Sequence, residues 1–541
     1  MPAPNSQYQV QEIPLKIVGG VNYGRYPKIS QEQTWNFIVS DGFLVPYAGY
    51  KNQLTLDELQ EGRGLYSSYR SNQMYAVIGS NFYVISQSLQ VLLTESIYTN
   101  EGDVYFSENN GGQITFTDNQ YMYVYRYSGT DALGNFRTSN PAQGAAAFTF
   151  PFPGNPPGYV SFQNGRTIAA AIGSTNWVLS GANDSTVWSA VDVSKVGSLQ
   201  TKPDFIQAAV PVPGGGNNIM VFGRNVVEFW QDVGAAKFPY QRLSTSNVDY
   251  GCINPASIAS LNNQVVWIAV NEQSGPVLMV AQGTSAKSIS TDGIDFKLGN
   301  LTNPSNCTGF LYQQDGHLLY QFTWPDDNIS YAYDFNTQLF FSVSDENLNY
   351  HIARQVVYFN DTYYFVSLNG GNVYEFDTLF PDAEYATGDV RLIPRIRITP
   401  PFRLPSQRMF IIKSLGFTVE NGQPNRVTTT TAYSTVGDDL LTEGGDLIAT
   451  EAGAFISAED EDTPVALASY VTSDSAIYLS ISRDGGETFG SELEQPMNAT
   501  GKRKSRLIFQ RLGQANDASF QIKYVGVTRF CATDGILEVY T

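Results

Sequence analysis

The sequence predicts an all-β protein, in which a β-propeller is followed by a C-terminal β-sandwich-like platform domain. Short apolar and aromatic runs recur in pairs along most of the chain, and a tight polar turn joins each pair. Amphipathic helical periodicity is nearly absent. Aromatic residues make up 13% of the 541 residues and charged residues only 15%, a balance that suits many half-buried strands.

The paired runs predict β-hairpins, because Gly, Asn and Asp at their turns tolerate positive φ angles. Residues 74–78 and 82–85, for example, flank a Gly-Ser-Asn turn. Such hairpins fill residues 41–390, and their even recurrence favours a propeller. We expect six blades over this stretch. Each would then have about 58 residues, more than the roughly 40–50 of familiar propeller repeats, so we expect long loops.

We expect three regions along the chain. Residues 1–40 form an N-terminal arm, residues 41–390 form the propeller, and residues 391–541 form the platform domain. The second boundary follows from four prolines between residues 394 and 405, because closely spaced prolines mark a linker or a sheet edge.

An acidic insert at about residues 436–463 interrupts the platform domain. Residues 442–449 and 450–457 share a pattern of eight residues, with paired apolar residues after a polar turn. Such a repeat would form small stacked β-turns whose apolar edge a neighbour covers. A flexible acidic loop is the alternative interpretation.

The formal net charge of −19 bears on contact with nucleic acid. Proteins that grip DNA from outside normally have a basic face, because phosphate contacts supply most non-specific affinity. The average surface of this chain is therefore unsuited to holding DNA. Carboxylates that line a pore would repel phosphate and prevent sticking, whereas the simpler interpretation is that the charge keeps a large assembly soluble.

Cysteine usage and the absence of apolar segments indicate a reduced protein without a membrane anchor. The three cysteines lie far apart and have no Cys-x-x-Cys spacing, so neither a disulfide framework nor a zinc site is expected. The sequence shows no secretory signal and no apolar run of about 18 residues, so we expect no membrane insertion by this chain.

No motif for catalysis, for a cofactor or for a metal stands out, and we expect no enzymatic activity. The two histidines, His317 and His351, lie in strand-like settings and lack a metal-binding spacing. The most enzyme-like pattern is SRDGGETF at residues 482–489, which resembles the Asp-box of sialidase-type propellers. The Asp-box is a hairpin turn away from the active site, so Asp484, Gly485 and Gly486 predict a turn and not a catalytic site.

A basic cluster is unusual in so acidic a chain. It consists of Lys502, Arg503, Lys504 and Arg506, just before a predicted strand. These residues are candidates for a partner contact, either with another subunit or with the phosphates of passing DNA. A solvated loop tip is the other interpretation.

Residues 221–257 carry a more specific pattern. Its members are Phe222, Gly223, Glu228, Trp230, Gly234, Phe238, Pro239, Arg242 and Gly251. This pattern resembles the packaged-DNA stabilisation protein family of short-tailed bacteriophages (podoviruses), whose members are also called tail hub or nozzle proteins. Asp484, Gly485 and Gly486 also resemble landmarks of that family.

The resemblance implies a structural protein of the virion tail that is assembled in the cytoplasm of the bacterial host. Six copies would form a homohexameric ring below the portal-adaptor (head-to-tail connector) proteins. The ring would extend and close the DNA exit channel, retain packaged DNA until ejection, and carry tail fibres or spikes and a needle plug. Duplex DNA would pass through the lumen without tight binding. Two rival functions stay open, namely a sialidase-like propeller glycosidase and a receptor-binding tail fibre or spike.

Overall fold

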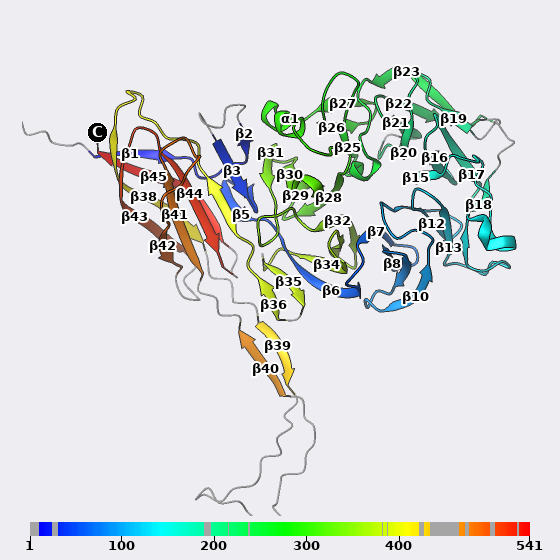
Figure 1. Cartoon of the computed structure of the whole chain (residues 1–541), viewed down its shortest axis with the longest axis horizontal. Coiled ribbons are helices and arrows are strands. Elements are labelled where there is room, and N and C mark those ends of the chain that lie inside the picture. Colours follow the sequence, from blue (N-terminus) through cyan, green and yellow to red (C-terminus); the bar gives the residue numbers. More distant parts are fainter. Residues whose placement is uncertain are drawn as a thin grey trace, which may run out of the picture.

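A computed structural model of the chain consists of two β-domains that lie side by side (Figure 1). The structure describes residues 10–23, 31–188, 196–214, 216–235, 238–380, 382–386, 388–420, 427–432, 465–470, 475–497, 504–526 and 530–540. The larger domain is a β-propeller and the smaller one a β-sandwich, as the sequence predicts.

The first four propeller blades are sheets whose strands follow one another along the chain. Blade one is β7 (Gly62–Ser68), β8 (Gln73–Ile78), β9 (Asn81–Ile85) and β10 (Val91–Ser96). Blade two is β11 (Tyr105–Glu108), β12 (Gln113–Thr117), β13 (Met122–Arg126) and β14 (Phe136–Thr138). Blade three is β15 (Pro157–Gln163), β16 (Arg166–Ala171), β17 (Asn176–Gly181), β18 (Asp184–Trp188) and β19 (Val196–Ser198). Blade four is β20 (Ile206–Pro211), β21 (Asn218–Gly223), β22 (Val227–Asp232) and β23 (Tyr240–Val248).

Three further blades follow. Blade five is β24 (Ala259–Leu261), β25 (Gln264–Ala269), β26 (Val277–Gln282) and β27 (Ser285–Ser288). Blade six is β28 (Thr308–Gln314), β29 (His317–Trp324), β30 (Ile329–Asp334) and β31 (Leu339–Ser342). Blade seven is β32 (Ala353–Phe359), β33 (Thr362–Ser367), β34 (Gly371–Asp377) and β6 (Gly49–Asp57), with β35 (Ala383–Ala386) and β36 (Asp389–Arg391) beyond β6. Short helical segments connect strands at η1 (Pro141–Ala146), η3 (Pro255–Ser257), α1 (Asp292–Leu298) and η4 (Pro325–Asp327).

The described residues thus form seven blades, and the expected number of six was wrong. Blades one to seven occupy residues 62–377, which gives about 45 residues per blade, within the usual range for propeller repeats. The connections are therefore shorter than a six-bladed arrangement required. Each blade contributes apolar side chains to cores that it shares with its neighbours.

A strand from before the first blade closes the propeller. β6 pairs with β34 in antiparallel register, with Tyr50 opposite Phe376. The first strand of the last blade, β32, in turn contacts β7 of the first blade. Because blade seven is completed by a chain segment about 300 residues away in sequence, closure couples the two ends of the propeller.

The sandwich packs two sheets around one apolar core. The first has the order β4-β5-β45-β38-β43, with β1 on β45. Its members are β1 (Val10–Leu15), β4 (Phe37–Ser40), β5 (Phe43–Pro46), β38 (Phe410–Glu420), β43 (Lys504–Ala515) and β45 (Cys531–Tyr540). The second joins β3 (Gln31–Trp35), β37 (Arg395–Ile398), β44 (Ser519–Val525), β41 (Ala476–Ser482) and β42 (Leu493–Pro496), with β2 (Asn22–Tyr23) on β3.

The described part of the predicted N-terminal arm, residues 1–40, holds four strands, β1 to β4. β1 extends the first sandwich sheet, and β3 lies in the second. β3 also pairs in parallel with β31 of blade six, through Trp35 and Ser342. Blade six and the second sandwich sheet are consequently one continuous sheet of ten strands, which fixes the two domains relative to each other.

A two-stranded hairpin, β39 (Val427–Ala432) with β40 (Val465–Tyr470), projects from the sandwich (Figure 1). The acidic insert predicted at about 436–463 lies outside the described residues. Among the described residues, no helix has the length and apolar composition needed to cross a bilayer.

Candidate functional site

Residues 221–257 run from β21 to β23 of blade four and into the connection to blade five, and the polar centre of the pattern is Glu228. This carboxylate on β22 is fully buried. It accepts hydrogen bonds from the backbone N–H groups of Gln200, at 2.7 Å, and Thr201, which belong to the connection between blades three and four. The indole of Trp230 donates to the other oxygen at 3.0 Å, and Arg242 forms an ion pair with the same carboxylate at 4.0 Å. Glu228 thus fastens the chain where it passes from one blade to the next.

Aromatic members of the pattern fill the core between blades three and four. Trp230 and Phe238 both contact Trp177 of β17, with ring centroids 5.6 Å and 5.3 Å apart. Phe222 packs instead on Trp267 of blade five, at 5.3 Å. Pro239 precedes β23 and is half-buried. These residues build the blade junctions.

The glycines of the pattern differ in their surroundings. A side chain at Gly251 would collide with the backbone of Arg224 and Asn225, and one at Gly223 would collide with Asp204. Gly234 is exposed, with open space around it and a φ of +65°, which favours glycine. The first two allow close packing and the third permits a turn. Every described member of the pattern thus has a structural explanation.

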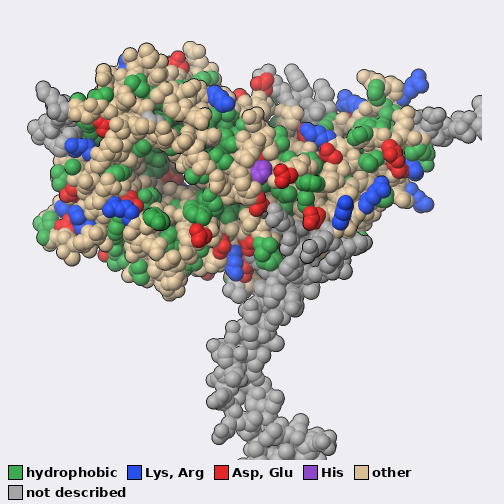
Figure 2. Space-filling model, turned by 180° about the vertical axis from the view of Figure 1, so that it is seen from behind, with side chains coloured by type: hydrophobic (Ala, Val, Ile, Leu, Met, Phe, Trp, Pro, Cys, Tyr) green, Lys and Arg blue, Asp and Glu red, His purple; other side chains and the backbone are tan. Residues whose placement is uncertain are grey.

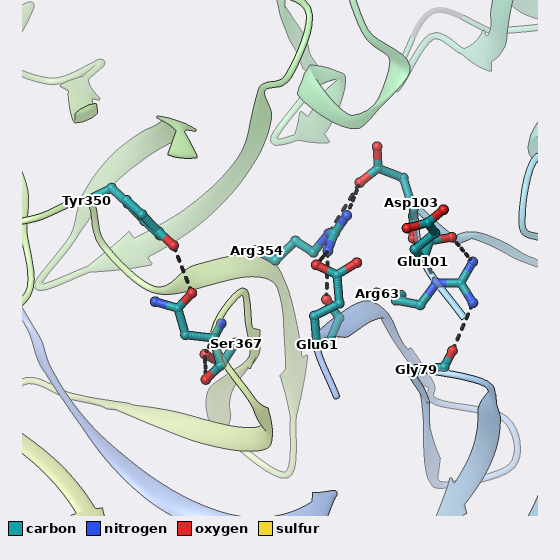
Figure 3. Close-up of polar contacts among 11 residues, drawn as sticks. Glu61, Arg63, Gly79, Glu101, Asp103, Tyr350, Arg354 and Ser367 are labelled. Carbon is teal, nitrogen blue, oxygen red and sulfur yellow. Dashed lines mark hydrogen bonds and ion pairs between the residues drawn. The ribbon is translucent and has the colours of Figure 1, made fainter. Parts of the chain in front are cut away.

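A cluster of charged side chains lies at the centre of the propeller, where blades seven, one and two meet (Figure 3). Arg354 of β32 donates to Asp103 at 2.8 Å and to the carbonyl of Gly62 at 3.0 Å, and it forms an ion pair with Glu61 at 3.3 Å. All but about a tenth of its side chain is buried. Arginine suits this position because its planar fork serves several acceptors at once.

Arg63 of β7 lies beside this cluster and is also buried. Its guanidinium donates to the carbonyls of Gly79, Thr99, Glu101 and Gly102. Arg63 and Arg354 both border a cavity of about 80 Å³ at the propeller axis. Through these contacts the two arginines link blade seven, blade one and the connection to blade two beside the axial cavity. Sequence reasoning missed this cluster, and the only available signal was an arginine between two glycines, Gly62 and Gly64, in an apolar hairpin.

The Asp-box-like segment forms the predicted turn, in the sandwich between β41 and β42. Asp484 accepts from the backbone N–H of Glu487 and Thr488, and Ser482 donates to it at 2.6 Å. Hydrogen bonds from Ser482 and Thr488 hold the pKa of Asp484 below its usual range. Gly485 and Gly486 have φ angles of +84° and +99°. The structure therefore gives this motif a local role in turn formation.

The basic cluster is only partly described. Lys502 and Arg503 lie outside the described residues, whereas Lys504 and Arg506 are exposed at the start of β43. β43 ends the first sandwich sheet, and its alternate residues Ser505 and Leu507 face the core. Lys504 and Arg506 consequently point outward from one sheet face. Figure 2 shows several Lys and Arg side chains spread over the sandwich end of the molecule.

The two histidines are buried in the propeller. His317 on β29 lies 2.8 Å from Asp334 on β30, between neighbouring strands. His351 packs against Tyr47, Tyr50 and Phe365, and its burial lowers its pKa to about 3. Within the described ranges, no group of three or more His, Cys, Asp or Glu residues could hold a metal ion.

Comparisons with known proteins give a consistent assignment. A family model described as "Bacteriophage P22 Gp10, beta-propeller" matches residues 25–380, and one described as "Bacteriophage P22 Gp10, beta-sandwich" matches residues 461–539. No curated protein matches the chain.

Several solved structures resemble the chain over part of its length, at low sequence identity. A catalytically inactive virginiamycin B lyase from Staphylococcus aureus with quinupristin is 11% identical, covers 61% of this chain and 98% of its own, and has a TM-score of 0.41. The computationally designed protein Ika8 is 10% identical, covers 61% of this chain and 100% of its own, and has a TM-score of 0.38. The WD40 domain of Pan2 from Neurospora crassa is 7% identical, covers 58% and 89%, and has a TM-score of 0.37. Similarities this distant carry no information about activity.

Proposed function

Because the chain belongs to the bacteriophage P22 Gp10 family, the packaged-DNA stabilisation or tail hub proteins of podoviruses, we propose that it forms a ring in the virion tail that extends the DNA exit channel. The observation that carries this proposal is the match of both family domains, in order, along one chain. In the proposed tail, six copies sit below the portal-adaptor proteins, help retain packaged DNA, and carry fibres or spikes and a needle plug.

The fold supports a mechanical role of this kind. The propeller closes on itself through β6, and a ten-stranded sheet continues from blade six into the sandwich. A subunit with fixed domains keeps its two contact surfaces at a constant angle. Head-to-tail contacts at a constant angle close into a ring when that angle divides the circle. Several modest interfaces then act together, so that the ring holds even where one contact alone is weak.

The excess of acidic residues supports the proposal that the channel does not bind DNA tightly. The chain carries 51 acidic and 32 basic residues. Acidic groups along the channel would repel the phosphates and let the duplex slide, since phosphate neutralisation is what supplies non-specific affinity. The protein acts in this proposal by shape and rigidity, without catalysis and without a cofactor. The exposed Lys504 and Arg506 are the candidate contacts to a neighbouring subunit or an adaptor protein.

Measuring the mass of the assembly tests whether the chain forms a ring of six copies. The full chain is mixed with the adaptor ring of its phage, and the complex is measured by native mass spectrometry and imaged by electron microscopy. We expect six copies stacked coaxially on the adaptor, and weak DNA retention by the chain in a filter assay at physiological salt. A three-fold assembly at a fibre tip, a solitary monomer that hydrolyses a chromogenic sialoside, or tight DNA binding would contradict the proposal.

A charge reversal tests the contact residues separately. We expect the double variant Lys504→Glu/Arg506→Glu to lower the fraction of chain found in the assembly. The matched control is Lys287→Glu, which changes an exposed lysine on β27 of the propeller. An equal loss in both variants would mean that general charge, and not the sandwich face, governs assembly.

A further inference from the structure

A groove of about 560 Å³ opens on the rim of blades two and three. Its lining comes from the turn between β12 and β13 and from the irregular segment 139–157, which leads from β14 to β15. In Figure 1 β13 and β18 mark this rim, at the end of the molecule away from the sandwich. The groove volume is typical of small-molecule sites. It is unrelated to the sandwich surface considered above.

The walls of this groove, which we call the rim groove, are held by hydrogen bonds. The backbone N–H of Met122 donates to the hydroxyl of Ser139 at 2.9 Å, and the backbone N–H of Ser139 donates to the carbonyl of Met122 at 2.8 Å. On the opposite wall, the side-chain amide of Asn155 donates to the carbonyl of Ile172 at 2.9 Å. A groove fixed on both sides is formed before any ligand arrives, which lowers the entropic cost of binding.

Aromatic rings provide its apolar surface. Phe148 and Phe150 are buried and join the core between blades two and three. Tyr121 and Phe152 are half-buried and keep part of their rings accessible. Tyr121 is braced edge-on by Tyr98, with ring centroids 5.6 Å apart, and the hydroxyl of Tyr98 donates to Gln143 at 2.7 Å. The accessible rings are thus set in place by their neighbours.

The lining is uncharged. The described residues that border the rim groove include Gln120, Ser139 and Asn155, but no Asp, Glu, Lys, Arg or His. A charged ligand would find no opposite charge there and would lose hydration on entry. The groove therefore favours a neutral ligand that offers both an apolar face and hydroxyl groups.

An extended peptide fits less well. A peptide that binds by adding a strand pairs its backbone with a sheet edge. The rim groove is walled by loops, and four of its residues, Pro141, Pro153, Pro156 and Pro157, have no N–H to offer. A pyranose ring, by contrast, places C–H groups on its faces and hydroxyls around its rim. The C–H faces pack on aromatic rings, and the hydroxyls pair with amide and hydroxyl side chains.

We propose that the rim groove is a binding site for a neutral saccharide, in which Tyr121 and Phe152 stack on the sugar ring and Gln120 and Ser139 bind its hydroxyls. The site does not depend on ring assembly, so its test leaves the function proposed above untouched. A saccharide site on a rim of the propeller would give the protein a contact with carbohydrate in addition to its structural role.

Calorimetric titration of the full chain tests this proposal. The probes are the neutral oligosaccharides maltohexaose, chitohexaose and mannohexaose, with oligogalacturonate as a charged comparator and a proline-rich peptide as a peptide comparator. We expect at least one neutral oligosaccharide to bind in the millimolar range or more tightly. Tyr121→Ala should weaken that binding by about tenfold or more, whereas Tyr121→Phe should retain it.

The matched control is Tyr69→Ala, which removes a fully exposed tyrosine from the turn between β7 and β8 and should leave binding unchanged. If Tyr121→Ala does not fold, as judged by its thermal melt, Gln120→Ala takes its place, because Gln120 is exposed. No binding of any neutral probe, binding of only the charged or the peptide comparator, or equal affinities in all variants would overturn the proposal.

Discussion

Arg354 donates two hydrogen bonds to one carboxylate oxygen of Asp103, at 2.8 Å and 3.2 Å. Arg354 belongs to the last blade, and Asp103 lies in the connection between the first two. The pair therefore ties the end of the propeller to its beginning at the axis (Figure 3). Strand β6 ties the same two ends together farther out, through its pairing with β34. The ring of blades is therefore closed both near the propeller axis and at its outer strands.

We expect Arg354→Met to lower the free energy of unfolding by about 2–4 kcal/mol, because it leaves the largely buried Asp103 without its partner. Urea denaturation measures the loss. Arg391→Met is the matched control, since the Arg391 side chain is half-exposed where it pairs with Glu346 and Asp389, and exposed ion pairs are worth at most about 1 kcal/mol. A similar loss in both variants would show that the axial pair does not contribute to closure.

A second buried arginine, Arg397 on β37, fastens the N-terminal segment to the junction of the two domains. It donates to the carbonyls of Ile17 and Gly20 and to the hydroxyl of Thr34, and it pairs with Glu32. Lysine cannot reach these acceptors together, because it lacks the planar fork.

We expect Arg397→Lys to cost about 1–3 kcal/mol through unsatisfied buried acceptors. Hydrogen exchange should locate the effect, with faster exchange in residues 10–23 and no change in blade three. Uniformly faster exchange would mean that the contact stabilises the molecule generally and does not anchor this segment.

Gly251 is a further test of the structural interpretation of the family pattern. Gly251→Ala should destabilise the chain by about 1–3 kcal/mol, because the new methyl group meets the backbone of Arg224 and Asn225 in the turn between β21 and β22, and no side-chain rotation relieves this contact. Thermal unfolding compares it with Gly275→Ala, where the nearest atom is 3.6 Å away. Equal melting temperatures of the two variants would show that close packing does not explain why glycine belongs to the pattern at position 251.

The sequence predicted local features better than long-range ones. The hairpin expected at residues 74–85 is β8 with β9, and the turn expected at Asp484 is present. Both follow from a few neighbouring residues whose φ preferences are known. The blade number failed because β6, which completes the seventh blade, lies before the first blade, and no local pattern reveals this pairing.

The buried charged residues could not be predicted from the sequence, for a related reason. Glu228, Arg63 and Arg354 each look like surface residues in sequence, because charged side chains are rarely fully buried. Their partners include groups far away in the sequence, such as the backbone N–H of Gln200 for Glu228 and the carboxylate of Asp103 for Arg354. Only the resemblance to a family marked Glu228 beforehand, and nothing marked Arg354.

His351 gives a prediction for the pH dependence of stability. Burial lowers the pKa of its imidazole to about 3, from an ordinary value of 6.5. The unfolded chain therefore takes up a proton below pH 6.5 that the folded chain does not, so the stability that neutral His351 contributes is complete above that pH and falls as the pH decreases toward 3.

His351→Gln removes this contribution, and the side-chain oxygen of the glutamine can still accept the hydrogen bond that the backbone N–H of Ala353 donates to His351. Between pH 7 and pH 4.5 the parent chain should lose about 2–3 kcal/mol more than the variant. Urea titrations at both pH values measure the difference, and parallel losses would show that carboxylates alone set the acid sensitivity.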